Sequence, residues 1–157
     1  MKKILLVFAI LLIIIVGLRF TQSNLGSSRV SLFRKSPTIT INNQVFKVAT
    51  ATTSKDQQIG LSETKSLPQD QGMIFLFKSP GFYSFWMKNM KFPIDIIYID
   101  NNTIITIVNS APIPKNPSDN LTIYTPSKLS DKVLEINAGL SKKYNFKNGD
   151  KIKIDGI

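Results

Sequence analysis

The sequence contains no histidine and no cysteine. Their absence excludes Ser–His–Asp and Cys–His catalysis, the usual zinc sites, and haem ligation through either side chain. It also excludes disulfides, so any exported domain depends on its hydrophobic core for stability. No calcium-loop spacing is present either. We therefore expect no cofactor and no bound metal, and any acid–base chemistry would fall to Asp, Glu, Lys or Tyr.

Arginine is confined to the front of the chain, at Arg19, Arg29 and Arg34. From position 36 onward the basic residues are 14 lysines, which stand against 10 acidic residues. This part therefore carries only +4 of the total net charge of +10. Scattered lysines without clustered arginine are not typical of a nucleic-acid surface. We expect no nucleic-acid partner.

The longest apolar run stands behind Lys2 and Lys3 and covers residues 4–18. A membrane span usually needs about 20 apolar residues, and the core of a cleaved signal peptide needs about 7–15. No Ala-x-Ala cleavage site follows the run, which favours an uncleaved signal anchor over a cleaved signal peptide. We expect a single-pass membrane protein whose N-terminus is inside and whose domain is extracytoplasmic. Secretion after cleavage is the alternative.

Three regions follow from these patterns: a signal anchor or signal peptide at 1–20, a polar linker at 21–36, and a domain at 37–157. The domain alternates apolar and polar residues in short runs, which predicts eight or nine strands. One short helix is expected to start with Ser54 and Gln57 as a capping box and to stop at Gly60. A second is expected after Asn137, as its N-cap, and before Gly149.

The predicted strands are 38–41, 45–51, 72–77, 82–88, 94–100, 103–109, 121–126, 133–136 and a last one within 150–157. They do not alternate with helices, so a parallel sheet is not expected. The fold class predicted is mainly β, with a compact antiparallel β-sandwich or barrel and two short helices.

Polar residues interrupt the apolar strands near the short segment that separates the predicted strands 82–88 and 94–100 and ends in Pro93. Asp95 alternates with isoleucines, and Glu135 aligns with Val133, on faces that should belong to a core. A carboxyl group there needs a partner or must raise its pKa. We predict a ligand site in which Trp86 stacks on the ligand, Lys88 and Asn89 donate hydrogen bonds, and Asp95 and Glu135 accept them.

The same residues allow two other interpretations. Asp95 and Glu135 would suit a hydrolase of envelope glycans if their carboxyl groups were about 5–9.5 Å apart in an open cleft. Alternatively, Asp95 accepts backbone N–H bonds of the Lys88–Pro93 corner and Glu135 holds a loop, which would make the domain a structural spacer. We favour a non-enzymatic binding module for a small polar or carbohydrate-like ligand, or for a partner in the cell envelope.

Several motifs together resemble the DUF192 family, a domain of unknown function. They are GLSETKSLPQDQGMIFLF, FWMKNMKFPIDIIYID, VLEINAG and NGDKI, and the resemblance covers residues 38–155. It implies a small, mostly β domain that often follows a signal or anchor, and it implies no agreed activity. Met90 stands where the family usually has threonine. The shared positions are Gly60, Leu61, Gly72, Met73, Phe75, Trp86, Met87, Lys88, Asn89, Pro93, Asp95, Glu135, Asn137, Gly139, Gly149 and Asp150.

Overall fold

The structure is a computed structural model that describes residues 36–115 and 121–157. The predicted signal anchor and nearly all of the predicted linker lie outside these residues. Within the described ranges, no helix is both long enough and apolar enough to cross a membrane.

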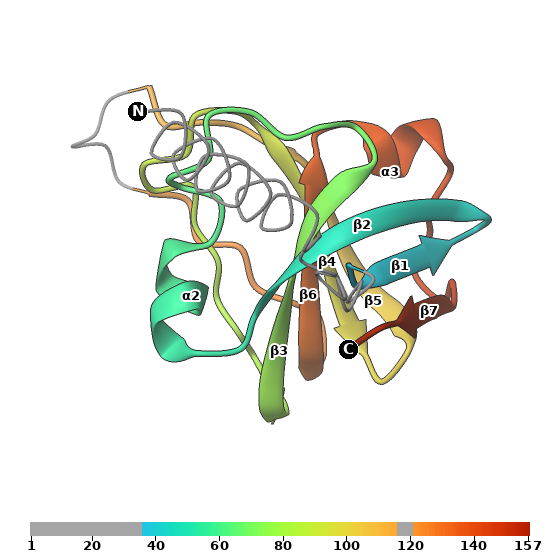
Figure 1. Cartoon of the computed structure of the whole chain (residues 1–157). Coiled ribbons are helices and arrows are strands. Elements are labelled where there is room, and N and C mark those ends of the chain that lie inside the picture. Colours follow the sequence, from blue (N-terminus) through green and yellow to red (C-terminus); the bar gives the residue numbers. More distant parts are fainter. Residues whose placement is uncertain (1–35, 116–120) are drawn as a thin grey trace, which may run out of the picture. The chain divides into compact units, whose positions relative to one another are not determined.

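The described residues form a single sheet of seven strands (Figure 1). The strands are β1 (Thr38–Ile41), β2 (Gln44–Ala51), β3 (Gln71–Gly81), β4 (Ile94–Asp100), β5 (Thr103–Ala111), β6 (Ser130–Asn137) and β7 (Ile152–Asp155). Their order across the sheet is β5-β4-β6-β3-β2-β1-β7. Neighbouring strands are antiparallel except β2 and β3, which are parallel. The predicted antiparallel arrangement therefore holds for five of the six neighbouring pairs, and β2 with β3 is the exception.

The sheet curls so that its two edge strands approach each other at one end. The backbone N–H of Ile104 donates to the Asp150 carbonyl at 2.9 Å, and that of Ile152 donates to the Asn102 carbonyl at 2.9 Å. The result is a half-barrel. The mainly β class with two short helices is confirmed, whereas the described residues form one curled sheet and not a two-sheet sandwich.

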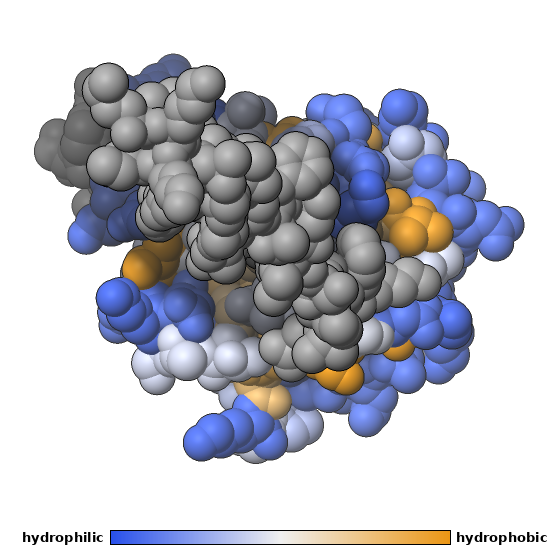
Figure 2. All heavy atoms as spheres, viewed as in Figure 1, coloured by the Kyte–Doolittle hydropathy of each residue, from blue (hydrophilic) through white to orange (hydrophobic). Residues whose placement is uncertain are grey.

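Both faces of the sheet carry a hydrophobic core, and strand β4, between β5 and β6, has six of its seven residues buried. The inner core lies in the concavity of the half-barrel and contains Ile39, Ile41, Phe46, Val48, Ile74, Ile97, Ile99, Ile104, Leu134, Ile136, Leu140, Phe146 and Ile152. The outer core contains Ala51, Leu61, Phe75, Met87, Ile94, Ile96, Tyr98, Ala111 and Val133. On the face shown in Figure 2, the coloured surface is largely hydrophilic with small separate hydrophobic areas.

Helix α2 (Ser54–Ile59) lies in the connection between the parallel strands β2 and β3 (Figure 1). Its N-cap is Thr53, one residue before the predicted position. The Thr53 hydroxyl accepts the Asp56 N–H at 3.1 Å and donates to the Asp56 carboxylate at 2.6 Å. Gly60 ends the helix, as predicted, with φ at +50°.

Helix α3 (Leu140–Lys143) is shorter than predicted and begins later. Asn137 was expected to cap it, but Asn137 is the last residue of β6. Its side-chain amide donates instead to the carbonyls of Leu67 at 2.7 Å and Pro68 at 3.1 Å. The N-cap residue is Gly139, whose φ of +84° turns the chain into the helix.

The predicted strands 82–88 and 121–126 are not regular strands. They meet in one isolated bridge, where Phe85 and Tyr124 exchange two backbone hydrogen bonds of 2.9 Å. Buried and half-buried side chains of both segments pack on the outer core. This packing gives them an apolar pattern typical of strands, although they lack a continuous ladder. The segment 82–92 instead crosses the outer face of the sheet.

Candidate functional site

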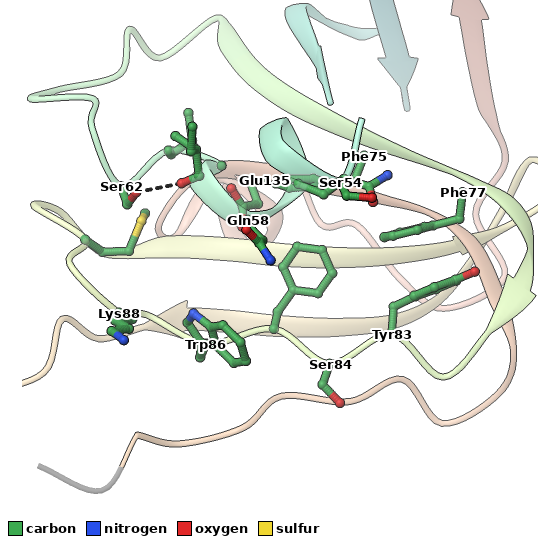
Figure 3. A pocket seen from close by; sticks show the side chains of 16 residues that line it. Ser54, Gln58, Ser62, Phe75, Phe77, Tyr83, Ser84, Trp86, Lys88 and Glu135 are labelled. Atoms are coloured by element: carbon green, nitrogen blue, oxygen red, sulfur yellow. Dashed lines mark hydrogen bonds between the residues drawn. The ribbon is translucent and has the colours of Figure 1, made fainter. Parts of the chain in front are cut away.

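A pocket of about 300 Å³ opens on the outer face of the sheet (Figure 3). Helix α2 and residues 60–62 form one wall, strands β3 and β6 form the floor, and the segment 82–92 forms the opposite wall. Its volume lies at the lower end of the roughly 300–1,000 Å³ typical of small-molecule sites. The lining residues are Ser54, Gln57, Gln58, Ile59, Gly60, Leu61, Ser62, Phe75, Phe77, Tyr83, Ser84, Phe85, Trp86, Lys88, Met90 and Glu135.

The wall formed by α2 is fixed to the sheet by a side chain of its own. The Gln57 amide donates to the Leu76 carbonyl at 2.9 Å, which joins the helix to β3. Just after the helix, Gly60 lies close to the pocket floor. A Cβ atom there would stand 3.2 Å from the Phe75 ring and 3.8 Å from Glu135 Oε2. The glycine therefore gives the chain its positive φ and also keeps the space above Glu135 open.

Aromatic rings form much of the remaining lining. Phe77 and Tyr83 stack with their ring centroids 3.5 Å apart, and they lie at one end of the pocket in Figure 3. Phe75 and Phe85 meet edge to face at 4.9 Å. Trp86 is 49% exposed and lies with Lys88 toward the other end (Figure 3). An indole ring this exposed contributes little to the core and presents an aromatic surface to whatever enters the pocket.

Glu135 is the acidic group of the pocket lining and is only 5% exposed. Its Oε2 atom is buried and has no hydrogen-bond partner among the described residues. The three ion pairs found in the described ranges do not include it. Burial raises the pKa of Glu135 to about 8, because the apolar surroundings disfavour the charged form. The carboxyl group is therefore largely protonated and neutral at pH 7.

Tyr98 lies on the same face of the sheet as Glu135 and is fully buried. Its hydroxyl donates to the Tyr124 carbonyl at 2.8 Å. Burial, and then the negative charge that Glu135 can carry, both raise the pKa of Tyr98. Tyr98 therefore stays neutral and serves the structure. In the part of the chain that the structure describes, no three acidic side chains gather in a way that could hold a metal.

Asp95 lies on the other side of the sheet. Its carboxylate accepts three backbone N–H groups: Ser110 at 2.7 Å, Gly139 at 2.9 Å and Ser141 at 2.8 Å. The assignment of Asp95 to the ligand site was wrong, because its side chain faces the inner core. The alternative prediction, that Asp95 accepts backbone N–H groups, agrees with these hydrogen bonds. However, the bonds come from the end of β5 and the start of α3, and not from the Lys88–Pro93 corner.

This placement also overturns the predicted acid–base pair. In the β4–β6 ladder Asp95 is opposite Ile136 and Ile96 is opposite Glu135. Because side chains alternate along a strand, the two carboxyl groups point to opposite faces of the sheet. They share no cleft, so they cannot act together on a glycosidic bond.

Three of the five predicted site residues line the same pocket: Trp86, Lys88 and Glu135. Asn89 does not line it. It is exposed and has φ at +60°, in the turn where the Met90 N–H donates to the Met87 carbonyl. The prediction missed the polar residues that α2 contributes, above all Ser54 and Gln58. Only the capping signal before Gly60 marked that helix, and nothing in the sequence placed it against Glu135.

Comparison with known proteins gives a family and a fold. The sequence profile of DUF192, described as an uncharacterized ACR, matches residues 37–154. A crystal structure of a protein of unknown function from Novosphingobium aromaticivorans is 34% identical, with a TM-score of 0.65 over 74% of this chain and 82% of that chain. One from Sinorhizobium meliloti, provisionally described as a transcription regulator, is 26% identical, with a TM-score of 0.66 over 77% and 93%. Among curated proteins, none matches the chain.

Proposed function

The chain belongs to the DUF192 family, and we propose that this member is a binding module whose pocket takes a small polar ligand. The observation that carries the proposal is the buried Oε2 atom of Glu135, which has no partner within the described residues and faces a pocket. A buried polar atom without a hydrogen bond costs about 1–3 kcal/mol of stability. A ligand that supplies the missing bond would recover this free energy.

The two buried carboxyl groups of the domain support this interpretation by their contrast. Asp95 is satisfied by three backbone donors, which is the pattern of a structural carboxylate. Glu135 has an oxygen that no described residue pairs with, and it lies beside the pocket. A group retained in this state is more easily explained by a ligand than by the stability of the fold.

The lining suits recognition of a polar or carbohydrate-like molecule. Trp86 offers an exposed ring for stacking, Lys88 offers a cation, and α2 adds the hydroxyl of Ser54 and the amide of Gln58. We propose binding and not hydrolysis because, within the described ranges, Glu135 is the one carboxyl group that lines the pocket, and glycoside hydrolysis needs two.

The description of the Sinorhizobium meliloti protein raises the question of DNA binding. The domain of the present chain has no arginine after position 34, and its lysines are scattered. Arginine makes the commonest base-specific contacts in DNA complexes. We therefore keep the pocket, and not a nucleic-acid surface, as the proposed functional site.

We also propose that residues 4–18 hold the protein in the membrane with the domain on the extracytoplasmic side. The support is the apolar run behind Lys2 and Lys3. Carbonate extraction of membranes should leave the full chain in the pellet, and protease added to the outside should remove the domain. Recovery of a chain shortened near position 20 in the soluble fraction would instead show a cleaved signal.

The proposed pocket can be tested through its own tryptophan, because Trp86 is the single tryptophan in the sequence. The full chain in mild detergent is titrated with a panel of sugars, cell-wall fragments and metabolites while Trp86 emission is recorded. A saturable change, together with a rise in the unfolding temperature, is the expected result. A ligand present at 100 times its dissociation constant should add about 2.7 kcal/mol to the stability.

A matched control is available in Glu63, the only other glutamate. It is exposed and does not line the pocket. Glu63→Gln should bind as the unchanged protein does, whereas Glu135→Gln should bind more weakly. Equal binding by both variants would place the site elsewhere, and no response to any member of the panel would contradict the proposed function.

A further inference from the structure

We infer that the group recognised at the floor of the pocket is a cationic amine of the ligand, held by the Glu135 carboxylate against the surrounding aromatic rings. This inference rests on the proposed function and names the chemical class of its ligand. It predicts that binding displaces the proton of Glu135.

The charged side chains of the pocket favour a cationic ligand. Lys88 and Glu135 are the charged side chains that line the pocket. Lys88 is exposed, and Glu135 is buried without an ion-pair partner in the described ranges. A buried carboxylate is stable only when a cation or several donors compensate it. Among the described residues, no side chain supplies a cation at the floor, so a cationic ligand would be the missing partner.

Aromatic rings lie around the Glu135 carboxyl group. Phe75 is a floor residue within reach of the space above Glu135, since a Cβ atom on Gly60 would contact the Phe75 ring at 3.2 Å and stand 3.8 Å from Glu135 Oε2. Phe85 packs edge to face on Phe75 at 4.9 Å, and Trp86 lies nearer the opening. The Phe75 atoms nearest this space are Cζ and Cε1, at the tip of the ring. Together the rings keep water away from the buried Glu135 carboxyl group, and a less polar environment strengthens the attraction between an ammonium group and a carboxylate.

The other titratable groups of the pocket determine how a bound ligand would be oriented. The titratable groups that face the pocket besides Glu135 are Lys88 and Tyr83, and Tyr98 lies on the same side of the sheet. The two tyrosine hydroxyls already donate to backbone carbonyls, at 2.6 Å for Tyr83 and 2.8 Å for Tyr98. Lys88 would repel an amine near the segment 82–92. The amine therefore belongs at the floor, and a neutral or anionic end of the ligand belongs beside Lys88.

The proton balance of this binding step is simple. The O–H bond of the neutral Glu135 carboxyl breaks, its proton goes to the buffer, and the resulting carboxylate accepts hydrogen bonds from the ligand ammonium. Burial raises the pKa of Glu135 to about 8, so each binding event well below that pH releases close to one proton. For an amine that stays protonated over the whole range, such as methylammonium, the apparent affinity should rise about tenfold per pH unit up to about pH 8 and then level off.

The test compares glucosamine with N-acetylglucosamine, which has a similar shape but no cationic amine, and adds methylammonium as a minimal probe. Trp86 emission of the full chain is followed at pH 6, 7, 8 and 9, and calorimetry in two buffers of different ionisation enthalpy counts the released protons. We expect glucosamine to bind at least tenfold more tightly than N-acetylglucosamine at pH 7, where the glucosamine amine is still largely protonated. Release of nearly one proton is expected at pH 6 and 7.

The variants separate the inference from the proposed function. Glu135→Gln, checked for folding by thermal unfolding, should lose at least tenfold in amine affinity and all of its pH dependence, while Glu63→Gln should keep both. Tighter binding of N-acetylglucosamine or another neutral panel member, without proton release, would overturn the inference and support the proposed pocket. Methylammonium affinity that falls as the pH rises through 8 would also overturn it, because this probe stays cationic there and the neutral carboxyl would then be the binding form. No binding by any probe would overturn both proposals.

Discussion

Asp95 and Glu135 stand at successive steps of the same β4–β6 ladder and point to opposite faces of the sheet. The Asp95 carboxylate faces the inner core and accepts hydrogen bonds from three backbone N–H groups. Glu135 reaches the outer face, where its Oε2 atom lies beside a pocket and finds no hydrogen-bond partner in the part of the chain that the structure describes. One carboxyl group therefore serves the fold, and the other is available for a ligand. This division leads to different expectations for the two residues.

Asp95→Asn should destabilise the domain by about 3 kcal/mol. The amide has one oxygen in place of two, so at least one of the three backbone N–H groups loses its charged acceptor. Chemical denaturation measures this loss directly. The matched control is Asp70→Asn, since the Asp70 side chain makes an exposed ion pair with Lys47 at 3.5 Å and its loss should change stability little. Equal stabilities of the two variants would contradict the structural role of Asp95.

The stability of the domain should fall as the pH rises from about 4.5 to about 8. Burial raises the pKa of Glu135 from its ordinary value of 4.5 to about 8, so between these values the folded state holds a proton that the unfolded chain has lost. This contribution is fully present below about pH 4.5 and is lost by about pH 8, with a slope of about 1.4 kcal/mol per pH unit between these values. Subtracting the stability curve of Glu135→Gln from that of the unchanged protein isolates it. A flat difference between pH 5 and 8 would show that Glu135 is not buried as described.

Gly72→Ala should strongly destabilise the sheet. A Cβ atom at Gly72 would lie 2.7 Å from the backbone carbonyl oxygen of Glu135, and a carbonyl in a strand ladder cannot move aside. We expect a loss of at least 2 kcal/mol. Gly139→Ala is the comparison: it also adds a methyl group, but nothing lies within 4 Å, so only its φ of +84° opposes the change. A smaller loss for Gly72→Ala than for Gly139→Ala would mean that β3 and β6 are less closely paired than the structure shows.

Trp86→Ala should weaken ligand binding and leave the fold nearly intact. Trp86 is 49% exposed, whereas Phe75, in the same pocket lining, is 1% exposed. Phe75→Ala should cost about 3–5 kcal/mol, as is usual for a core aromatic residue. We expect less than about 1 kcal/mol for Trp86→Ala. Thermal unfolding of both variants checks this, and a large loss at Trp86 would identify it as a core residue.

Most strands could be predicted from the sequence because their signals are local. The pairs Asn42–Asn43 and Asn101–Asn102 stand between alternating runs, and the structure places the predicted turns there. The segment 82–88 was wrongly predicted as a strand because its alternation reflects packing on the outer core. The parallel pairing of β2 with β3 was missed because it depends on a connection of 19 residues that contains only a six-residue helix.

The site was only partly predictable for a similar reason. Trp86, Lys88 and Glu135 stood out as polar or half-polar groups within apolar strands, and all three line the pocket. Asp95 was predicted as a site residue for the same reason, because it too is a polar residue within an apolar strand. Only the register between β4 and β6, which no single strand reveals, separates its face from that of Glu135.

Both proposals depend on Glu135 being a buried, neutral carboxyl group at the floor of the pocket. The most direct test is a carbon NMR titration of the full chain with labelled glutamate side-chain carboxyls. The sequence contains only Glu63 and Glu135, so two signals are expected, and Glu135→Gln assigns them. We predict a midpoint for Glu135 at about pH 8, in line with the pKa to which burial raises it. A midpoint near the ordinary 4.5 would show a solvated or paired carboxylate and would contradict the account.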